Sequence, residues 1–149
     1  MKVNPIPDGY HTVTPYIVVI GASKLIEFLK NAFDAKELSL HKDPNGRVMH
    51  CEMQVGDSIV LIGEPNPGAS PTSMHFYMFV PDTDATYKKA LEAGGISLME
   101  PADQFYGDRN AGIKDPTGNS WWIGTRIENL SPEEMKRREE EFMNKMMGK

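Results

Sequence analysis

Three residues of this sequence have side chains suited to acid–base chemistry and a spacing that can bring them together. His50 and Glu52 lie two residues apart in a run that alternates polar and apolar residues, so both leave the same face of a predicted strand. His75 alternates in the same way with Tyr77 and Phe79. An imidazole exchanges protons near neutral pH, and a carboxylate can orient it and raise its basicity. His75 is therefore predicted as a general base or hydrogen-bond anchor, and the set of His75, His50 and Glu52 as an acid–base or nonstandard metal site. In the competing structural interpretation, these side chains are satisfied by neighbouring strand groups or by solvent.

A second group of residues is suited to binding rather than catalysis. The segment from Asp103 to Arg109 combines aromatic and charged side chains just before a turn, Asp115-Pro-Thr-Gly118. Gln104, Phe105 and Tyr106 can form a lid whose aromatic rings stack on a planar ligand, and Arg109 can bind an anion. Alternatively, Phe105 and an ion pair of Asp108 with an arginine hold this loop against the body of the protein.

The composition restricts the classes of protein that remain. The chain has 149 residues, one cysteine and a formal net charge of −5 at pH 7, with 40% hydrophobic residues. The acidity disfavours a nucleic-acid partner, and a single cysteine excludes an internal disulfide and a cysteine-rich zinc site. No apolar run approaches the ~18 residues of a membrane span, and the first residues do not resemble a signal peptide. We expect one soluble, cytoplasmic domain with no membrane or nucleic-acid partner.

The elements that must position these residues follow one order twice. The first set is a strand at 14–20, a helix at 24–33 capped by Ser23, and strands at 37–42, 47–55 and 58–63. The second set is a strand at 74–80, a helix from Asp82 or Thr83 to Ala93, and strands at 97–99, 110–114 and 120–125. Two β-α-β-β-β modules, at about 10–63 and 74–126, are thus predicted around a Pro- and Gly-rich linker at 64–73.

Side-chain alternation within the 47–55 strand makes a more detailed prediction. It places Met49, Cys51, Met53 and Val55 on an apolar face and Val48, His50, Glu52 and Gln54 on the opposite one. Cys51 is accordingly predicted to be a small core residue and not a nucleophile.

The last element is a helix at 131–147. Ser131 is placed to cap it, Pro132 fits its first position, and Glu134 can complete a capping box. A partial stripe of methionines with Phe142 is expected to pack on the chain itself or on a second subunit.

These modules and several segments resemble the vicinal oxygen chelate superfamily, and more narrowly its PhnB-like, glyoxalase–bleomycin-resistance-like branch. The segments are Thr14-Pro-Tyr-Ile-Val-Val19, Asp43-Pro-Asn-Gly-Arg-Val-Met-His-Cys-Glu52, Asp103-Gln-Phe-Tyr-Gly-Asp-Arg109, Asp115-Pro-Thr-Gly118 and Ser131-Pro-Glu-Glu-Met135. The resemblance implies an α+β fold in which the paired modules form a cup-shaped mixed sheet, followed by the C-terminal helix, and it implies a homodimer.

The resemblance also indicates where a site would lie. Metal enzymes of the superfamily take one ligand from the first and last strand of each module, which corresponds to Thr14, Ile62, His75 and Trp122. Only His75 is a usual ligand, so the standard divalent-metal site is expected to be absent and no cofactor is expected. The implied ligand-binding residues are Thr14, Tyr16, Tyr77, Phe79, Gln104, Tyr106, Arg109 and Trp122.

Three functional hypotheses follow. The first is a metal-independent protein that sequesters a small organic ligand in an aromatic pocket, as bleomycin-resistance proteins do. The second is a glyoxalase-like lyase or related enzyme that uses His75 with His50 and Glu52, with a divalent metal as an option. The third is a regulatory or scaffolding dimer that binds no small ligand.

Overall fold

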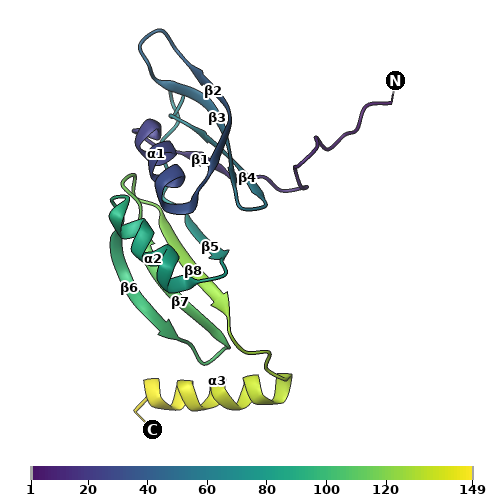
Figure 1. Ribbon diagram of the computed structural model, residues 1–149, viewed down its shortest axis with the longest axis vertical. Helices are drawn as coiled ribbons and strands as arrows, with labels where there is room; N and C mark the ends of the chain where they lie inside the picture. The colour runs from purple at the N-terminus through teal and green to yellow at the C-terminus, as the bar shows by residue number, and fades with distance from the viewer. Residues whose placement is uncertain (1, 149) are drawn as a thin grey trace.

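The computed structural model describes residues 2–148 and has the predicted α+β architecture (Figure 1). The first module contains β1 (Tyr16–Val18), α1 (Ala22–Phe33), β2 (Lys36–Lys42), β3 (Val48–Val55) and β4 (Ser58–Gly63). The second contains β5 (His75–Phe79), α2 (Thr83–Glu92), β6 (Ile96–Asp103), β7 (Asp108–Lys114) and β8 (Ser120–Arg126), and α3 (Pro132–Met146) follows it. The fold class, the two β-α-β-β-β units and the C-terminal helix are confirmed.

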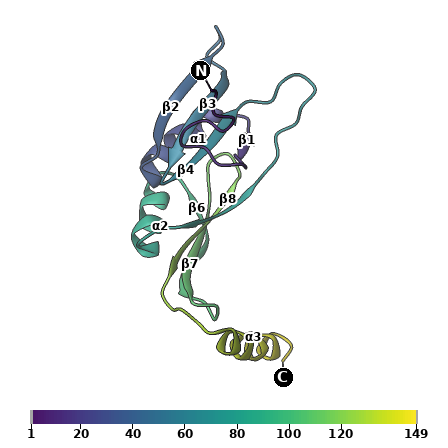
Figure 2. The same cartoon turned by 90° about the vertical axis from the view of Figure 1, so that its right-hand side faces the viewer.

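Each module forms its own four-stranded sheet. Sheet A has the order β1-β4-β3-β2 and sheet B the order β5-β8-β7-β6, and in each the first pair is parallel while the others are antiparallel. The helices α1 and α2 lie on the same side of the molecule and contact each other (Figure 1). The opposite side of each sheet, which we call its open face, is covered by no helix in Figures 1 and 2.

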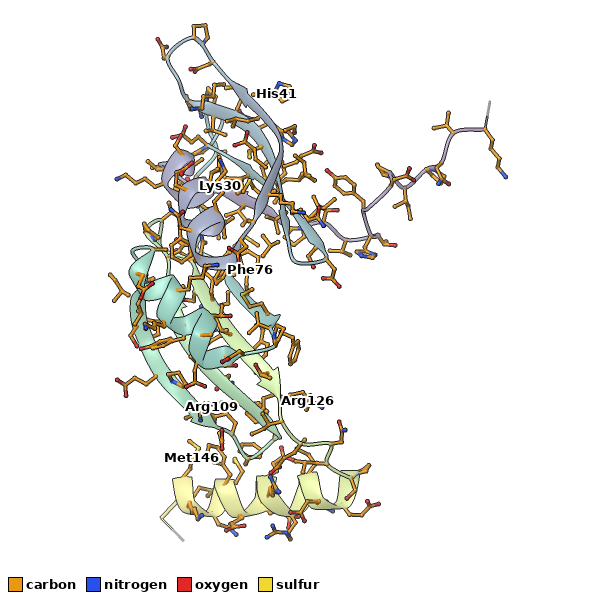
Figure 3. All side chains as sticks on the ribbon, viewed as in Figure 1. Lys30, His41, Phe76, Arg109, Arg126 and Met146 are labelled. Atoms are coloured by element: carbon orange, nitrogen blue, oxygen red, sulfur yellow. The ribbon has the colours of Figure 1, made fainter. Side chains whose placement is uncertain are left out.

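One core lies between the helices and the sheets and runs through both modules. The helix side chains Leu25, Phe28 and Leu29 are buried there because they share one face of α1. Phe33 contacts Trp121 of sheet B with ring centroids 5.2 Å apart, and Trp121 stacks on Phe76 at 4.3 Å. Figure 3 shows Phe76 where the two modules meet. The modules therefore share a hydrophobic core although their sheets are separate.

The start of α1 differs from the prediction. The helix begins at Ala22 after Gly21, whose φ of 80° needs a glycine, and no side chain caps it. Ser23 therefore lies inside the helix and is not its cap. Capping of α2 by Asp82 is confirmed, since its carboxylate accepts a hydrogen bond from the amide of Ala85.

The predicted alternation of β3 is wrong at its beginning. Val48 is fully buried, whereas Met49 is 43% exposed. The pairing of β2 with β3 skips one residue here, from His41–His50 to Lys42–Val48, so a β-bulge at Met49 reverses the side-chain directions. Beyond the bulge the alternation holds: Cys51 and Met53 are buried. Cys51 is a core residue, as predicted.

The turn at Asp115–Gly118 is organised by one buried carboxylate. Asp115 accepts hydrogen bonds from the amide and hydroxyl of Thr117, both at 2.7 Å, and from the amide of Asn119 at 3.3 Å. Its second oxygen accepts the indole N–H of Trp121 at 2.8 Å. This carboxylate therefore fixes Trp121 toward the core, and Trp122 must point to the open face.

Helix α3 stands at the far end of sheet B, as Figure 2 shows. The Ser131 hydroxyl caps it by accepting from the amide of Glu134, but the Glu134 carboxylate pairs with Arg137 and Arg138 instead of completing the capping box. These arginines lower the pKa of Glu134 to about 2. None of the residues of α3 is buried, although Phe142 packs on Phe105 with ring centroids 4.6 Å apart.

Within residues 2–148, none of the helices has the length and apolar character needed to cross a bilayer.

Candidate functional site

The open face of sheet B carries two aromatic rings, and each lies over a glycine. A Cβ added at Gly124 would stand 2.6 Å from the hydroxyl oxygen of Tyr77 and 2.8 Å from its ring. A Cβ added at Gly112 would overlap the indole of Trp122 in the same way. These glycines let the rings lie flat on the strands, where Tyr77 stays 44% exposed. The result is an apolar, partly exposed aromatic surface on a rigid sheet.

Beside this surface is a polar cluster centred on Asp108 and Asn110, both 3% exposed. The Tyr77 hydroxyl donates to Asp108 at 3.0 Å, and the Asn110 side-chain amide donates to the hydroxyls of Tyr77 and Tyr106, at 3.1 and 2.5 Å. Arg126 pairs with the other oxygen of Asp108 at 2.6 Å. Burial, together with the neighbouring Asp108 carboxylate, raises the pKa of Tyr77 to about 12. Tyr77 is therefore a neutral hydrogen-bonding group at physiological pH.

His75 lies at the start of β5, exposed and next to Trp122. Its Nδ1 is 3.3 Å from the indole nitrogen of Trp122, which can only donate, so this imidazole nitrogen is the acceptor. The hydrogen bond orients the imidazole along the edge of the aromatic surface. His75, Tyr77, Phe79 and Trp122 are thus brought together on β5 and β8, as the sequence suggested.

The open face of sheet A carries more polar side chains, among them His50, Glu52 and His41. Tyr16 lies over Gly63, and its hydroxyl is 3.5 Å from Nδ1 of His50. The imidazole of His41 is a further neighbour, with its centroid 6.5 Å from that of His50. In Figure 3, His41 on this sheet and Arg126 on sheet B both point away from the helices. His50 and Tyr16 are therefore adjacent, but they belong to a different sheet from His75.

The carboxylate of Glu52 has both oxygens engaged. It accepts from the hydroxyl of Tyr10, which the N-terminal segment brings across sheet A, and from Ser39 at 2.8 Å. These hydrogen bonds, that of Tyr10 first, lower the pKa of Glu52. The bond to the Glu52 carboxylate raises the pKa of Tyr10 to about 12. In the single chain, Glu52 thus holds Tyr10 of the N-terminal segment against β3, and its predicted acid–base role stays a prediction.

The expected lid is a tight hairpin turn. Strands β6 and β7 extend further than predicted, and the amide of Gln104 bonds the carbonyl of Asp108 at 2.7 Å. Tyr106 reaches the polar cluster from this turn, whereas Arg109 lies on β7 and points to the helix side. Arg109 makes a bidentate pair with Asp84 of α2 and contacts Asp103 at 3.0 Å. Its donors are therefore engaged away from the open face.

The residues do not fit the metal site of the vicinal oxygen chelate enzymes. Ile62 is fully buried toward α1, and its neighbours on the open face, Leu61 and Gly63, carry no ligand atoms. Trp122 offers only a donor. Thr14 lines a small cavity of about 200 Å³ beside Tyr10. Within residues 2–148, no three His, Cys, Asp or Glu side chains are grouped so that they could hold a metal ion.

A cavity of about 840 Å³ lies between the modules. Most of its lining consists of core-facing side chains such as Phe33, Phe76 and Met78, together with residues of the β3–β4 turn and of α2. Tyr77 and Phe79 line it as well because β5 is an edge strand. The cavity and the open face of sheet B therefore form a continuous apolar surface around β5.

The sequence over residues 10–123 matches the profile of the glyoxalase/bleomycin resistance protein/dioxygenase superfamily. The chain belongs to this superfamily. An uncharacterised protein of Mycobacterium bovis is 29% identical over 136 residues, which covers 83% of this chain and 88% of that protein. The resemblance inferred from the motifs is confirmed.

Solved structures show the same fold. TioX from Micromonospora sp. matches with a TM-score of 0.63 at 16% identity, over 77% of this chain and 99% of TioX. The PhnB protein of Bacillus cereus matches with a TM-score of 0.58 at 16% identity, over 77% of this chain and 99% of that protein. At these identities the likeness concerns the fold alone.

The sequence suggested that Asp108 pairs with an arginine, and the structure identifies that arginine as Arg126. Tyr10 and Asn110 were not predicted, although one regularity of the sequence points to the open faces. Gly63 follows Tyr16 by 47 residues, and Gly124 follows Tyr77 by the same distance. In both modules the tyrosine lies on the first strand and its ring covers a glycine of the last strand. The equal spacing of the two tyrosine–glycine pairs thus marks equivalent positions on the two open faces.

Proposed function

We propose that this superfamily member binds a small planar organic ligand on the open face of sheet B, without the standard divalent-metal site. The observation that supports this most directly is the placement of Tyr77 and Trp122 over glycines, which holds two aromatic faces in position without a covering element. Aromatic rings fixed in this way stack on planar ligands at little entropic cost. Binding and sequestration of such a ligand need no reacting group on the protein.

We also propose that a second copy of the chain completes the pocket. The open face of each sheet exposes apolar groups in the single chain, among them Tyr16, Tyr77 and Phe79, the last 63% exposed. Exposed apolar patches of this kind usually mark an interaction site. In a homodimer, sheet A of one chain facing sheet B of the other would close a cup and bring Tyr16 and His50 opposite Trp122.

A binding experiment with defined probes tests this function. Indane, oxindole and N-methyloxindole are titrated into the protein and followed by ligand-observed NMR and calorimetry, while light scattering gives the oligomeric state. We expect at least one probe to bind the dimer, and Trp122→Ala to weaken binding about tenfold or more through loss of a stacking surface. Leu98→Ala, on exposed β6, is the matched control and should bind normally. A monomer that binds none of the probes would contradict the proposal.

Metal titration separates this function from a glyoxalase-like lyase. Zn²⁺, Ni²⁺, Mn²⁺, Fe²⁺ and Co²⁺ are added to the wild type, His75→Ala and Glu52→Ala, and the bound metal is measured. Near-stoichiometric metal that both variants lose would favour an enzyme in which the dimer assembles His75, His50 and Glu52. A dimer that takes up neither metal nor probe would favour the scaffolding role.

A further inference from the structure

Within residues 2–148, the amide oxygen of Asn110 is the single buried side-chain polar atom that has no hydrogen-bond partner. Leaving a buried acceptor unsatisfied is costly, so this oxygen needs a donor, which a bound water or a ligand can supply. This atom lies in the polar cluster next to Tyr77, at the aromatic surface described above.

The neighbouring hydrogen bonds determine which end of the Asn110 amide is free. The Tyr77 hydroxyl has one hydrogen, which goes to the carboxylate of Asp108 because a charged oxygen is the stronger acceptor. The Tyr77 oxygen can then only accept from Asn110, so the side-chain group of Asn110 that faces it must be the NH₂ group. Its two hydrogens bond the hydroxyls of Tyr77 and Tyr106. The oxygen is consequently left as an acceptor.

The charges around this acceptor favour a neutral ligand. Asp108 is the acidic group of the cluster, and Arg126 neutralises it at 2.6 Å. A cation would gain little from a carboxylate that is already paired, whereas a neutral N–H donor would satisfy Asn110 without a charge to desolvate.

Tyr106 lies against the side-chain amide of Asn110. Asn110 is 3% exposed, and Tyr106, half-buried on the β6–β7 turn, bonds its amide nitrogen at 2.5 Å. Tyr106 packs edge-on against Phe105, which rests on Phe142 of α3. Phe105 and α3 therefore support the turn on which Tyr106 lies.

We propose that Asn110 is the specificity residue of the open face of sheet B: it selects planar ligands that carry a neutral ring N–H, such as lactams and imides, and Tyr106 is its gate. This inference rests on the proposed function, because it names the class of ligand for the same surface. The ring would stack on Tyr77 and Trp122 while its N–H donates to the amide oxygen of Asn110.

The test compares oxindole, a lactam with a ring N–H, with N-methyloxindole, which differs by one methyl group. We expect oxindole to bind the wild type about tenfold more tightly, since the methylated probe leaves the buried oxygen unpaired. In ¹⁵N-labelled protein, oxindole should shift the side-chain amide signals of Asn110 and N-methyloxindole should not. Asn110→Leu should bind both probes equally, whereas Asn129→Leu, at an exposed asparagine, should keep the tenfold preference.

The outcomes distinguish this inference from the function on which it rests. Equal binding of the two lactams by the wild type would overturn the role of Asn110 and leave the aromatic binding surface supported. A preference that persists in Asn110→Leu would also overturn it. If neither lactam nor indane binds, both the binding function and the role of Asn110 fail. The comparison of probes on the wild type needs no variant, so a poorly folded Asn110→Leu would not remove the test.

Discussion

Replacing Gly124 by alanine should destabilise the protein through a collision with Tyr77. The new methyl carbon would stand 2.6 Å from the hydroxyl oxygen and 2.8 Å and 3.0 Å from two ring carbons, all inside ordinary van der Waals contact. Tyr77 must then leave its place, which strains the packing by about 1–3 kcal/mol. Its displacement also breaks the hydrogen bonds to Asp108 and Asn110, each worth about 0.5–1.5 kcal/mol. With two hydrogen bonds lost, we expect a total loss of about 2–6 kcal/mol in the free energy of unfolding.

A double-mutant cycle isolates this collision from other effects of the substitution. In a Tyr77→Ala background the ring is gone, and Gly124→Ala should be neutral or stabilise by up to about 1 kcal/mol, because alanine loses less backbone entropy in a strand. The coupling between the two sites should therefore be at least about 2 kcal/mol. Urea unfolding followed by circular dichroism gives the four free energies, provided the denaturant slope stays constant.

Gly112→Ala is the matched control, since its methyl group would meet Trp122 instead of Tyr77. The loss of stability caused by Gly112→Ala should persist in the Tyr77→Ala background and disappear in the Trp122→Ala background. If Gly124→Ala lowers the free energy of unfolding equally with and without Tyr77, the tyrosine ring does not lie over this glycine and does not form the aromatic surface.

Three further predictions concern the framework of the site. Asp115→Asn should lower the free energy of unfolding, measured by urea denaturation, by about 2–4 kcal/mol. The amide of asparagine cannot accept from all the donors around position 115, which include the buried Trp121 N–H. A loss below about 1 kcal/mol would contradict this. The Cys51 thiol is fully buried, and burial raises its pKa to about 11. It should therefore react with Ellman's reagent only when the protein unfolds. Rapid labelling of the native protein would refute its position in the core. Tyr10→Phe should cost at most about 1 kcal/mol near pH 7. The difference in stability between the wild type and Tyr10→Phe should shrink when the pH falls through the lowered pKa of Glu52. It should also shrink when the pH rises toward the Tyr10 pKa of about 12. A difference that does not change with pH would contradict the hydrogen bond.

The sequence predicted the elements whose signals are local. The Asp115-Pro-Thr-Gly118 turn and the Asp82 and Ser131 caps depend on residues a few positions apart, and all three are found. Strict alternation in the last strand also separated Trp121 from Trp122. The order of strands and helices then led to the fold, because this order repeats once along the chain.

Two local predictions, the Ser23 cap and the capping box at Glu134, were wrong, but most features that were not predicted depend on long-range contacts. The bulge at Met49 arises from how β2 meets β3, and no residue type in β3 marks it. The engagement of Glu52 by Tyr10 joins positions 42 residues apart. The pairing of Arg109 with Asp84 depends on where α2 lies over β7, so the sequence alone left its donors free for a ligand. Glu52 and Arg109 were assigned to a site because of their residue types. In the fold, their hydrogen-bond and ion-pair partners determine which of their atoms remain available.

The two open faces suggest how one framework can serve different chemistry. In both modules a tyrosine of the first strand covers a glycine of the last, and its hydroxyl reaches a polar side chain of the third strand. That side chain is His50 in the first module and Asn110 in the second. The tyrosine–glycine pair sets the position of the hydroxyl, and the third-strand residue decides whether the face offers an imidazole or an amide. In the proposed dimer each cup would hold one of each, so a ligand stacked on Trp122 would meet the amide from its own sheet and the imidazole from the facing one. The His50→Asn variant should then keep the preference for oxindole over N-methyloxindole, because that preference depends on Asn110 of the other sheet, and loss of the preference in this variant would contradict the division of roles.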